Sequence, residues 1–236
     1  MSIKTDFNFY TDSKGLDPDS TSPTLRNYHK FLWSKPLPNG HFFELRDNKK
    51  GAYLYHESEL GEFFLGSDAI THSYKNHQRK RWLTVQIPNE VNELFDTGST
   101  IGAYIVFPNN RIDGKHTINQ ARGVNSLIDD RFDLTLECIR RFYTGESSPL
   151  YDTLSRYADF FRLFTDFLGY THFFLLDDLI NEDETIKFYL PFDGFKTRPL
   201  FSIINQYLLY KERVIAFIEA RNKRIESFVR FLGEKY

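Results

Sequence analysis

The chain has 236 residues, of which 26% are charged and 17% aromatic, a balance typical of a folded globular protein rather than a disordered one. Thirty Lys and Arg residues against 32 Asp and Glu residues give a net charge of −2, which excludes a protein-wide basic field that attracts nucleic acid or anionic lipid. The only cysteine, Cys138, excludes an intramolecular disulfide and any multi-cysteine zinc or iron–sulfur site.

No stretch approaches the roughly 18 apolar residues that a membrane-spanning helix requires, and residues 1–12 lack the pattern of a secretory signal. We therefore expect a cytoplasmic protein with no membrane partner. We interpret residues 1–236 as a single α+β domain, in which an N-terminal, mostly antiparallel sheet packs against a C-terminal set of helices. Residues 1–22 are rich in turn-forming residues and poor in apolar anchors, which predicts an extended N-terminal arm.

The N-terminal half after this arm is dominated by strand patterns. Apolar residues at three- and four-residue spacing first predict a short helix over 24–33. Five runs rich in β-branched and aromatic residues then favour strands, and Gly, Pro, Asn and Asp separate them. These runs begin at His41, Ala52, Glu62, Arg81 and Ile101. A short helix over 90–95 is expected to cross between the last two strands.

The C-terminal half has the period of helices. A helix that Ser126 caps is predicted to continue to Tyr143, and a second is expected between Pro149 and Gly169. The run 173–176 fits a buried helix or a buried strand, and we favour the helix. Residues 187–192 resemble a short strand.

A long helix is predicted over 199–232, with an apolar seam of near-heptad spacing along one side. The seam is interpreted as a packing spine within the domain, and the alternative is a homodimerisation or protein-interaction helix. The opposite face is expected to be a solvated surface of paired charges. Its basic residues are Lys211, Arg213, Arg221, Lys223, Arg224 and Arg230.

The residues with the clearest chemical potential lie between 109 and 133, after a predicted strand end and before a predicted helix. Backbone N–H groups, the helix dipole and cationic side chains converge at such places and bind anions. We therefore predict a site for a phosphate-bearing small molecule, nucleotide or nucleic acid, with Arg111, Lys115, Asn119 and Arg122 as its ligand-binding residues. The net charge gives nucleic acid no support.

Three carboxylates in the same segment, Asp113, Asp130 and Asp133, are candidate catalytic residues that transfer protons or hold a metal ion. The competing interpretation is structural. Acidic residues early in the predicted helix and Arg140 and Arg141 late in it match what the helix dipole favours, and a tight polar connection explains the loop. Both interpretations remain open at this point.

Familiar enzyme signatures are missing, because the chain has no Gly-rich phosphate loop, no Gly-x-Ser-x-Gly elbow and no His-Glu-x-x-His helix. Asp113-Gly114-Lys115 matches the Asp-x-Lys element of metal-dependent nucleases, but Gly114 suits a turn better than a strand. Whether the protein is an enzyme and which cofactor it uses, if any, do not follow from the sequence.

An aromatic and basic cluster, Tyr28, His29, Trp33 and Lys35, precedes a proline-rich turn. Such a cluster stacks on a nucleic-acid base in some proteins and anchors a segment to the core in others, and we favour the anchor.

Several strings resemble a family of uncharacterised bacterial proteins that carry a domain of unknown function. They are DPDS from Asp17, SPTLR from Ser22, YHKFLWSKPLPNG from Tyr28, NRIDGK from Asn110, DRFDLTLECIRR from Asp130 and EARNKRI from Glu219. The resemblance extends over nearly the whole chain and implies no activity, substrate or catalytic residue.

Overall fold

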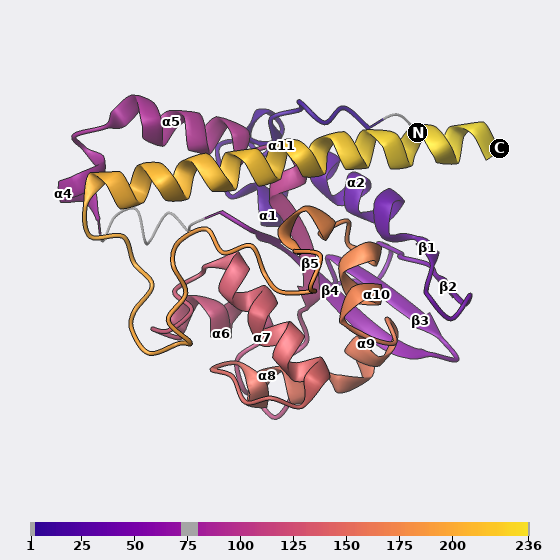
Figure 1. Ribbon diagram of the computed structural model, residues 1–236. Helices are drawn as coiled ribbons and strands as arrows, with labels where there is room; N and C mark the ends of the chain where they lie inside the picture. Colours follow the sequence, from indigo (N-terminus) through magenta and orange to yellow (C-terminus); the bar gives the residue numbers. More distant parts are fainter. Residues whose placement is uncertain (1–2, 72–79, 236) are drawn as a thin grey trace.

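The computed structural model describes residues 3–71 and 80–235, and a three-stranded antiparallel sheet lies at its centre (Figure 1). The strands are β3 (Leu54–Ser58), β4 (Gly61–Ala69) and β5 (Tyr104–Pro108), in the order β3-β4-β5. Every residue of β5 is buried, as its continuous apolar run requires of a strand covered on both faces. A ribbon of β1 (Lys35–Pro36) and β2 (Phe42–Phe43) lies beside this sheet.

The N-terminal residues carry two short helices before the predicted helix. A 3-10 turn covers Phe9–Thr11, α1 covers Pro18–Thr21, and α2 covers Pro23–Trp33. Ser22 caps α2 by accepting a hydrogen bond from the Leu25 N–H, and a proline at the first helical position suits the start of a helix. Because Phe9 is fully buried, this part of the expected N-terminal arm packs against the core.

The strand expected from Arg81 is wrong, since this run forms the short helix α4 (Arg81–Thr84). The run alternates apolar and polar residues, a pattern that predicts a half-buried strand. Two of its apolar residues, Trp82 and Val85, are instead exposed. The predicted crossing helix is confirmed as α5 (Pro88–Thr97), which lies alongside the long C-terminal helix in Figure 1.

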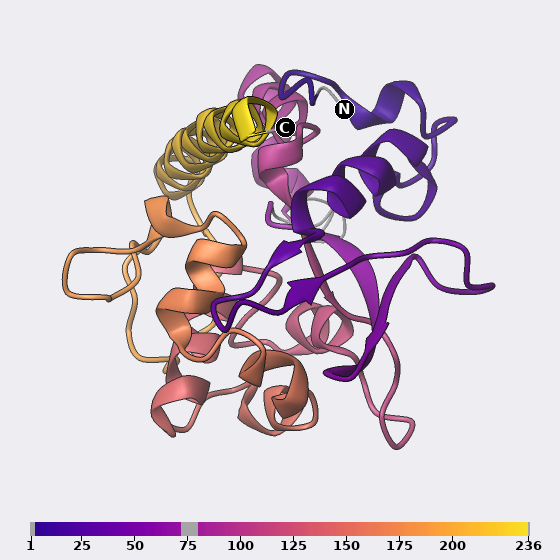
Figure 2. The ribbon, with the colours of Figure 1, turned by 90° about the vertical axis from the view of Figure 1, so that its right-hand side faces the viewer.

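A group of helices, most of them short, lies below and beside the sheet in Figures 1 and 2. They are α6 (Ile118–Val124), α7 (Phe132–Thr144), α8 (Tyr151–Ser155), α9 (Ala158–Arg162) and α10 (Phe167–Phe173). The single helix expected over 150–169 is therefore interrupted twice.

The prediction that Ser126 caps a helix is wrong, because the helix in that region, α7, begins at Phe132. Asp129 and Asp130 both have positive φ angles, of 49° and 65°, which a right-handed helix does not accommodate.

The segment after α10 contains a 3-10 turn at Asp177–Leu179, and the strand expected over 187–192 is absent from it. The Tyr189 N–H donates to the Asp133 carboxylate at 2.8 Å and not to a neighbouring strand. A side chain thus takes the place of a strand partner.

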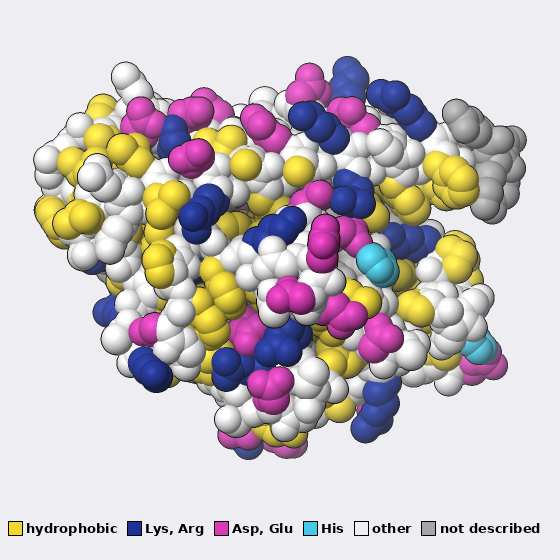
Figure 3. Space-filling view, in the orientation of Figure 1, with side chains coloured by type: hydrophobic (Ala, Val, Ile, Leu, Met, Phe, Trp, Pro, Cys, Tyr) yellow, Lys and Arg dark blue, Asp and Glu magenta, His cyan; other side chains and the backbone are white. Residues whose placement is uncertain are grey.

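The long helix is confirmed as α11 (Ile204–Lys235), and much of its seam packs inside the chain. Tyr207, Val214, Ile218 and Ile225 are fully buried, as expected of a packing spine. Lys and Arg alternate with Asp and Glu along its outer edge in Figure 3. Homodimerisation through this helix stays a prediction.

One basic residue of α11 departs from the expected solvated face. Arg221 is fully buried and donates hydrogen bonds to the carbonyls of Gly102, Tyr104 and Phe174. The α+β fold class is confirmed by the strand-rich N-terminal half and the helical C-terminal half. No helix in the described part combines the length and apolar character needed to cross a bilayer.

Candidate functional site

The predicted site residues separate into three environments. Arg111, Asp113 and Lys115 are exposed on the loop before α6. Asn119 and Asp130 are partly buried and line one common pocket. Arg122 and Asp133 are fully buried. The seven residues therefore do not converge on one cavity.

Arg122 is held entirely by protein groups. Its guanidinium forms a short ion pair with the Asp68 carboxylate of β4. It also donates to the Thr135 hydroxyl at 3.0 Å and to the Asp130 carbonyl at 2.9 Å. With no exposed surface, Arg122 positions neighbouring groups and has no free face to offer a ligand.

Asp133 is also fully engaged within the core. It pairs with Arg131, whose Nε lies 2.8 Å from one carboxylate oxygen, and accepts the Tyr189 N–H. The Asp113-Gly114 pair forms a turn in which both residues have positive φ, so Asp113 does not sit on a strand as the nuclease element requires.

Asn119 and Asp130 share their pocket with three further carboxylates, which the predicted site did not include. We call this cavity of about 560 Å³ the acidic pocket, and its wall includes Asp17, Asp19, Asp68, Asn119 and Asp130. Tyr10, Phe95 and Tyr104 add aromatic side chains to the wall.

Three separate chain segments position these carboxylates. Asp17 caps α1 by accepting the Asp19 N–H, and Asp19 accepts the Ser67 hydroxyl of β4 at 2.5 Å. Asp68 follows Ser67 on the strand and is fixed by Arg122.

Asp130 reaches the pocket from the left-handed turn before α7, next to Gly123. A Cβ added at Gly123 would lie 3.3 Å from the Asp130 carboxylate, so the absence of a side chain there leaves room for this acid.

The electrostatics of the acidic pocket favour one retained proton. Burial and the neighbouring Asp68 carboxylate raise the pKa of Asp19 to about 8. Burial also raises the pKa of Asp68 to about 6, although Arg122 opposes this increase. Because Arg122 favours the ionised form of Asp68, the pKa of Asp68 is the lower of the two. Near neutral pH the pair of acids therefore holds one proton, and that proton resides on Asp19.

A polar chain connects Asp19 to the interior. Beyond Ser67, the Tyr53 hydroxyl interacts with the Ser67 hydroxyl and lies 3.2 Å from Nδ1 of His29. Burial lowers the pKa of His29 to about 3, so its imidazole is neutral. His29 is therefore anchored inside the protein, as favoured for the aromatic cluster.

A second cavity, of about 380 Å³, lies between the loop before α6 and the start of α8. We call it the basic pocket, because Lys115, His116 and Arg156 line it. The Arg156 guanidinium donates to the His116 carbonyl at 2.8 Å, which ties the loop to α8. Lys115 is the one residue of the predicted ligand-binding set on this wall.

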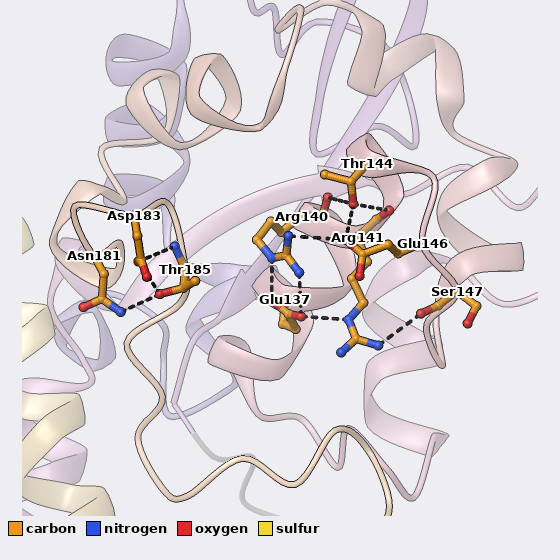
Figure 4. A network of polar contacts seen from close by, with 9 residues as sticks. All are labelled: Glu137, Arg140, Arg141, Thr144, Glu146, Ser147, Asn181, Asp183 and Thr185. Atoms are coloured by element: carbon orange, nitrogen blue, oxygen red, sulfur yellow. Dashed lines mark hydrogen bonds and ion pairs between the residues drawn. The ribbon is translucent and has the colours of Figure 1, made fainter.

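The charges at the end of α7 are satisfied by one another (Figure 4). Arg140 and Arg141 both donate to the carboxylate of Glu137, at 2.8 Å and 2.7 Å for the two Nε atoms. This arrangement supports the structural interpretation of these arginines. Cys138, next to Glu137 on the same helix, is buried, and burial raises the pKa of its thiol to about 12. Such a thiol is a poor nucleophile.

Sequence reasoning missed Asp19 and Asp68 because they are distant along the chain and neither belongs to a recognised motif. Asp68 lies three residues beyond the apolar run Glu62–Leu65, and nothing in that run marked it as part of a site. Across residues 3–71 and 80–235, no three His, Cys, Asp or Glu side chains are arranged to hold a metal ion.

Comparison with known proteins gives a family and no activity. No curated protein and no solved structure matches the chain. Residues 3–225 match a family of unknown function, DUF6994. Because the match extends over nearly the whole sequence, the chain belongs to this family of unknown function.

Proposed function

We propose that the protein binds a small amine-bearing molecule in the acidic pocket and that Asp19 exchanges a proton with it. The observation that carries the proposal is the set of four carboxylates that line this pocket, from Asp17, Asp19, Asp68 and Asp130. Within residues 3–71 and 80–235, the one guanidinium seen in contact with this set is that of Arg122, which is already committed to Asp68 and to protein carbonyls. A cationic ligand would therefore meet a surplus of negative charge.

The aromatic side chains of the pocket suit the same class of ligand. Tyr10, Phe95 and Tyr104 line the pocket with aromatic rings, and an ammonium group is attracted to the faces of such rings. The proton on Asp19 adds a group that titrates near neutral pH, as acid–base catalysis requires. Asp130 keeps its predicted role as a candidate catalytic residue, whereas Asp113 and Asp133 lie outside this pocket.

The first prediction concerns the pH dependence of amine binding. Because the Asp19 carboxyl is neutral below its raised pKa and ionised above it, affinity for an amine that stays protonated should increase by roughly tenfold between about pH 7 and pH 9. Isothermal titration with putrescine and agmatine, which remain mostly protonated over this range, measures this change. In the Asp19→Asn variant the increase should disappear.

The matched control for Asp19→Asn is Asp183→Asn, which removes an exposed carboxylate that does not line the pocket. This variant should bind amines as the unmodified protein does. Equal binding of 1,4-butanediol, which lacks the charge of putrescine, would contradict an electrostatic site. So would a pH profile that is unchanged in Asp19→Asn.

The second candidate function is the binding of a phosphate-bearing ligand, as predicted for the 109–133 segment, now at the basic pocket. The observation that favours it is the convergence of Lys115, His116 and Arg156 around a cavity. Lysine and arginine side chains are the usual partners of phosphate. Arg111 and Arg122 do not line this cavity.

The test is titration with inorganic phosphate, adenosine monophosphate and a short single-stranded oligonucleotide. Combined Lys115→Ala and Arg156→Met substitutions should weaken phosphate binding by about tenfold or more, since two cationic contacts are lost. Lys223→Ala, which removes an exposed cation on α11, serves as the control. Equal losses in the two variants would indicate non-specific attraction.

A further inference from the structure

An apolar groove separates the C-terminal end of α11 from α2 and the β1–β2 ribbon. Its volume is about 880 Å³, and Phe31, Pro36, Phe42, Val229 and Leu232 supply apolar side chains to its wall. Figure 3 shows a hollow at this place with hydrophobic side chains on both sides. The groove is distinct from the acidic and basic pockets, with which it shares no wall residue.

Lys35 lines this groove from β1 and is only 9% exposed. Its Nζ lies 4.5 Å from the ring centroid of Phe228, 4.6 Å from that of Phe173 and 5.1 Å from that of Trp33. Among the described residues it forms no hydrogen bond and no ion pair. Lys30 on the same groove differs, because it pairs with Asp47 at 2.9 Å.

A buried ammonium without a carboxylate partner is costly, and aromatic faces offset only part of that cost. The neutral amine is therefore favoured at Lys35. Burial lowers the pKa of Lys35 to about 7, the positive charge of Arg221 on α11 acts in the same direction, and Asp177 opposes both.

The other charged groups near Lys35 have their own partners or lie on the wall of the groove. Asp177 already pairs with His172 and with Arg224. Glu44 lies on the groove wall and pairs with Arg46 at 2.6 Å. None of these acids holds the Lys35 ammonium directly.

We propose that Lys35 is a reactive amine that forms an imine with apolar aldehydes or ketones bound in the groove. The lone pair of the neutral Nζ attacks the carbonyl carbon, and the electron pair of the C=O bond moves to oxygen, which takes up the proton released from nitrogen. The resulting carbinolamine expels water, and the C=N bond forms. Desolvated lysines in apolar pockets carry out this addition in enzymes that use covalent catalysis.

The experiment uses the full chain with a limiting amount of hexanal and with sodium cyanoborohydride, which reduces an imine to a stable secondary amine. Intact-mass measurement counts the adducts, and peptide mapping locates them. A single adduct on Lys35 is expected before exposed lysines react. Its rate, relative to the rates at exposed lysines, should be greatest near neutral pH, because a larger fraction of Lys35 than of an ordinary lysine is the neutral amine there.

Three comparisons decide the outcome. Glyceraldehyde, a polar aldehyde, should label Lys35 at least about tenfold more slowly than hexanal, because the groove wall is apolar. Lys35→Arg should lose the early adduct, and Lys223→Arg, at an exposed lysine that does not line the groove, should retain it. Early labelling of exposed lysines such as Lys14 and Lys223, with Lys35 unmodified in the folded wild-type protein, would overturn the proposal even if Lys35→Arg fails to fold.

Discussion

Replacing Arg122 with Met is expected to lower the free energy of unfolding by about 3–5 kcal/mol, because it breaks a buried ion pair and leaves one partner behind. The Asp68 carboxylate would remain buried without its guanidinium, and the Thr135 hydroxyl and Asp130 carbonyl would lose a donor. Denaturant unfolding followed by circular dichroism measures the change.

Two variants separate this effect from a general cost of substitution. Arg122→Met combined with Asp68→Asn removes both charges, so it should recover part of the lost stability. Arg162→Met breaks the pair with Asp159, in which both side chains are exposed, and should cost less than about 1 kcal/mol. A loss at Arg122 no larger than that at Arg162 would contradict a buried ion pair.

The second large effect is expected at Arg221, the buried arginine of α11. Its guanidinium donates to the carbonyls of Gly102 at 3.0 Å, Tyr104 at 2.8 Å and Phe174 at 2.9 Å. These bonds join α11 to the start of β5 and the end of α10. Arg221→Met would leave three buried acceptors without a donor, which we expect to destabilise the protein by about 2–4 kcal/mol.

The matched control is Arg213→Met on the same helix. Arg213 also donates to two backbone carbonyls, those of Phe188 and Tyr189, but it is exposed, so water can replace it. Its loss should cost less than about 1 kcal/mol. Similar unfolding midpoints for the two variants would show that the burial of Arg221 adds nothing to stability.

Patterns within one segment predicted much of the fold. The apolar spacing of the long C-terminal helix and of the helix that Ser22 caps corresponds to faces that are buried in the structure. Where the prediction was wrong, a local backbone feature overrode the pattern. Asp129 and Asp130 have left-handed backbone conformations, so α7 starts after them. The run from Arg81 has the alternating pattern of a strand, but its apolar residues Trp82 and Val85 are exposed.

The candidate site was harder to predict because it depends on contacts across the chain. Asp19 and Asp68 meet only after α1 has packed against β4, and no spacing in the sequence encodes that meeting. The exposure of an arginine, on which its access to a ligand depends, likewise cannot be predicted from the sequence of one segment. The sequence pointed to Arg122 as a ligand-binding cation. In the structure Arg122 is fully buried, and it pairs with the Asp68 carboxylate, which it positions.

The enclosure of Arg122 also divides the acidic pocket into a stiff side and an adaptable side. Because its guanidinium joins β4, α6 and α7 in the core, that wall cannot move without opening a cooperatively folded unit. Gly15, exposed Leu16 and Asp17 also line the pocket, on a turn that contains the left-handed Lys14. We expect this turn, residues 14–17, to adjust when ligands of different size bind.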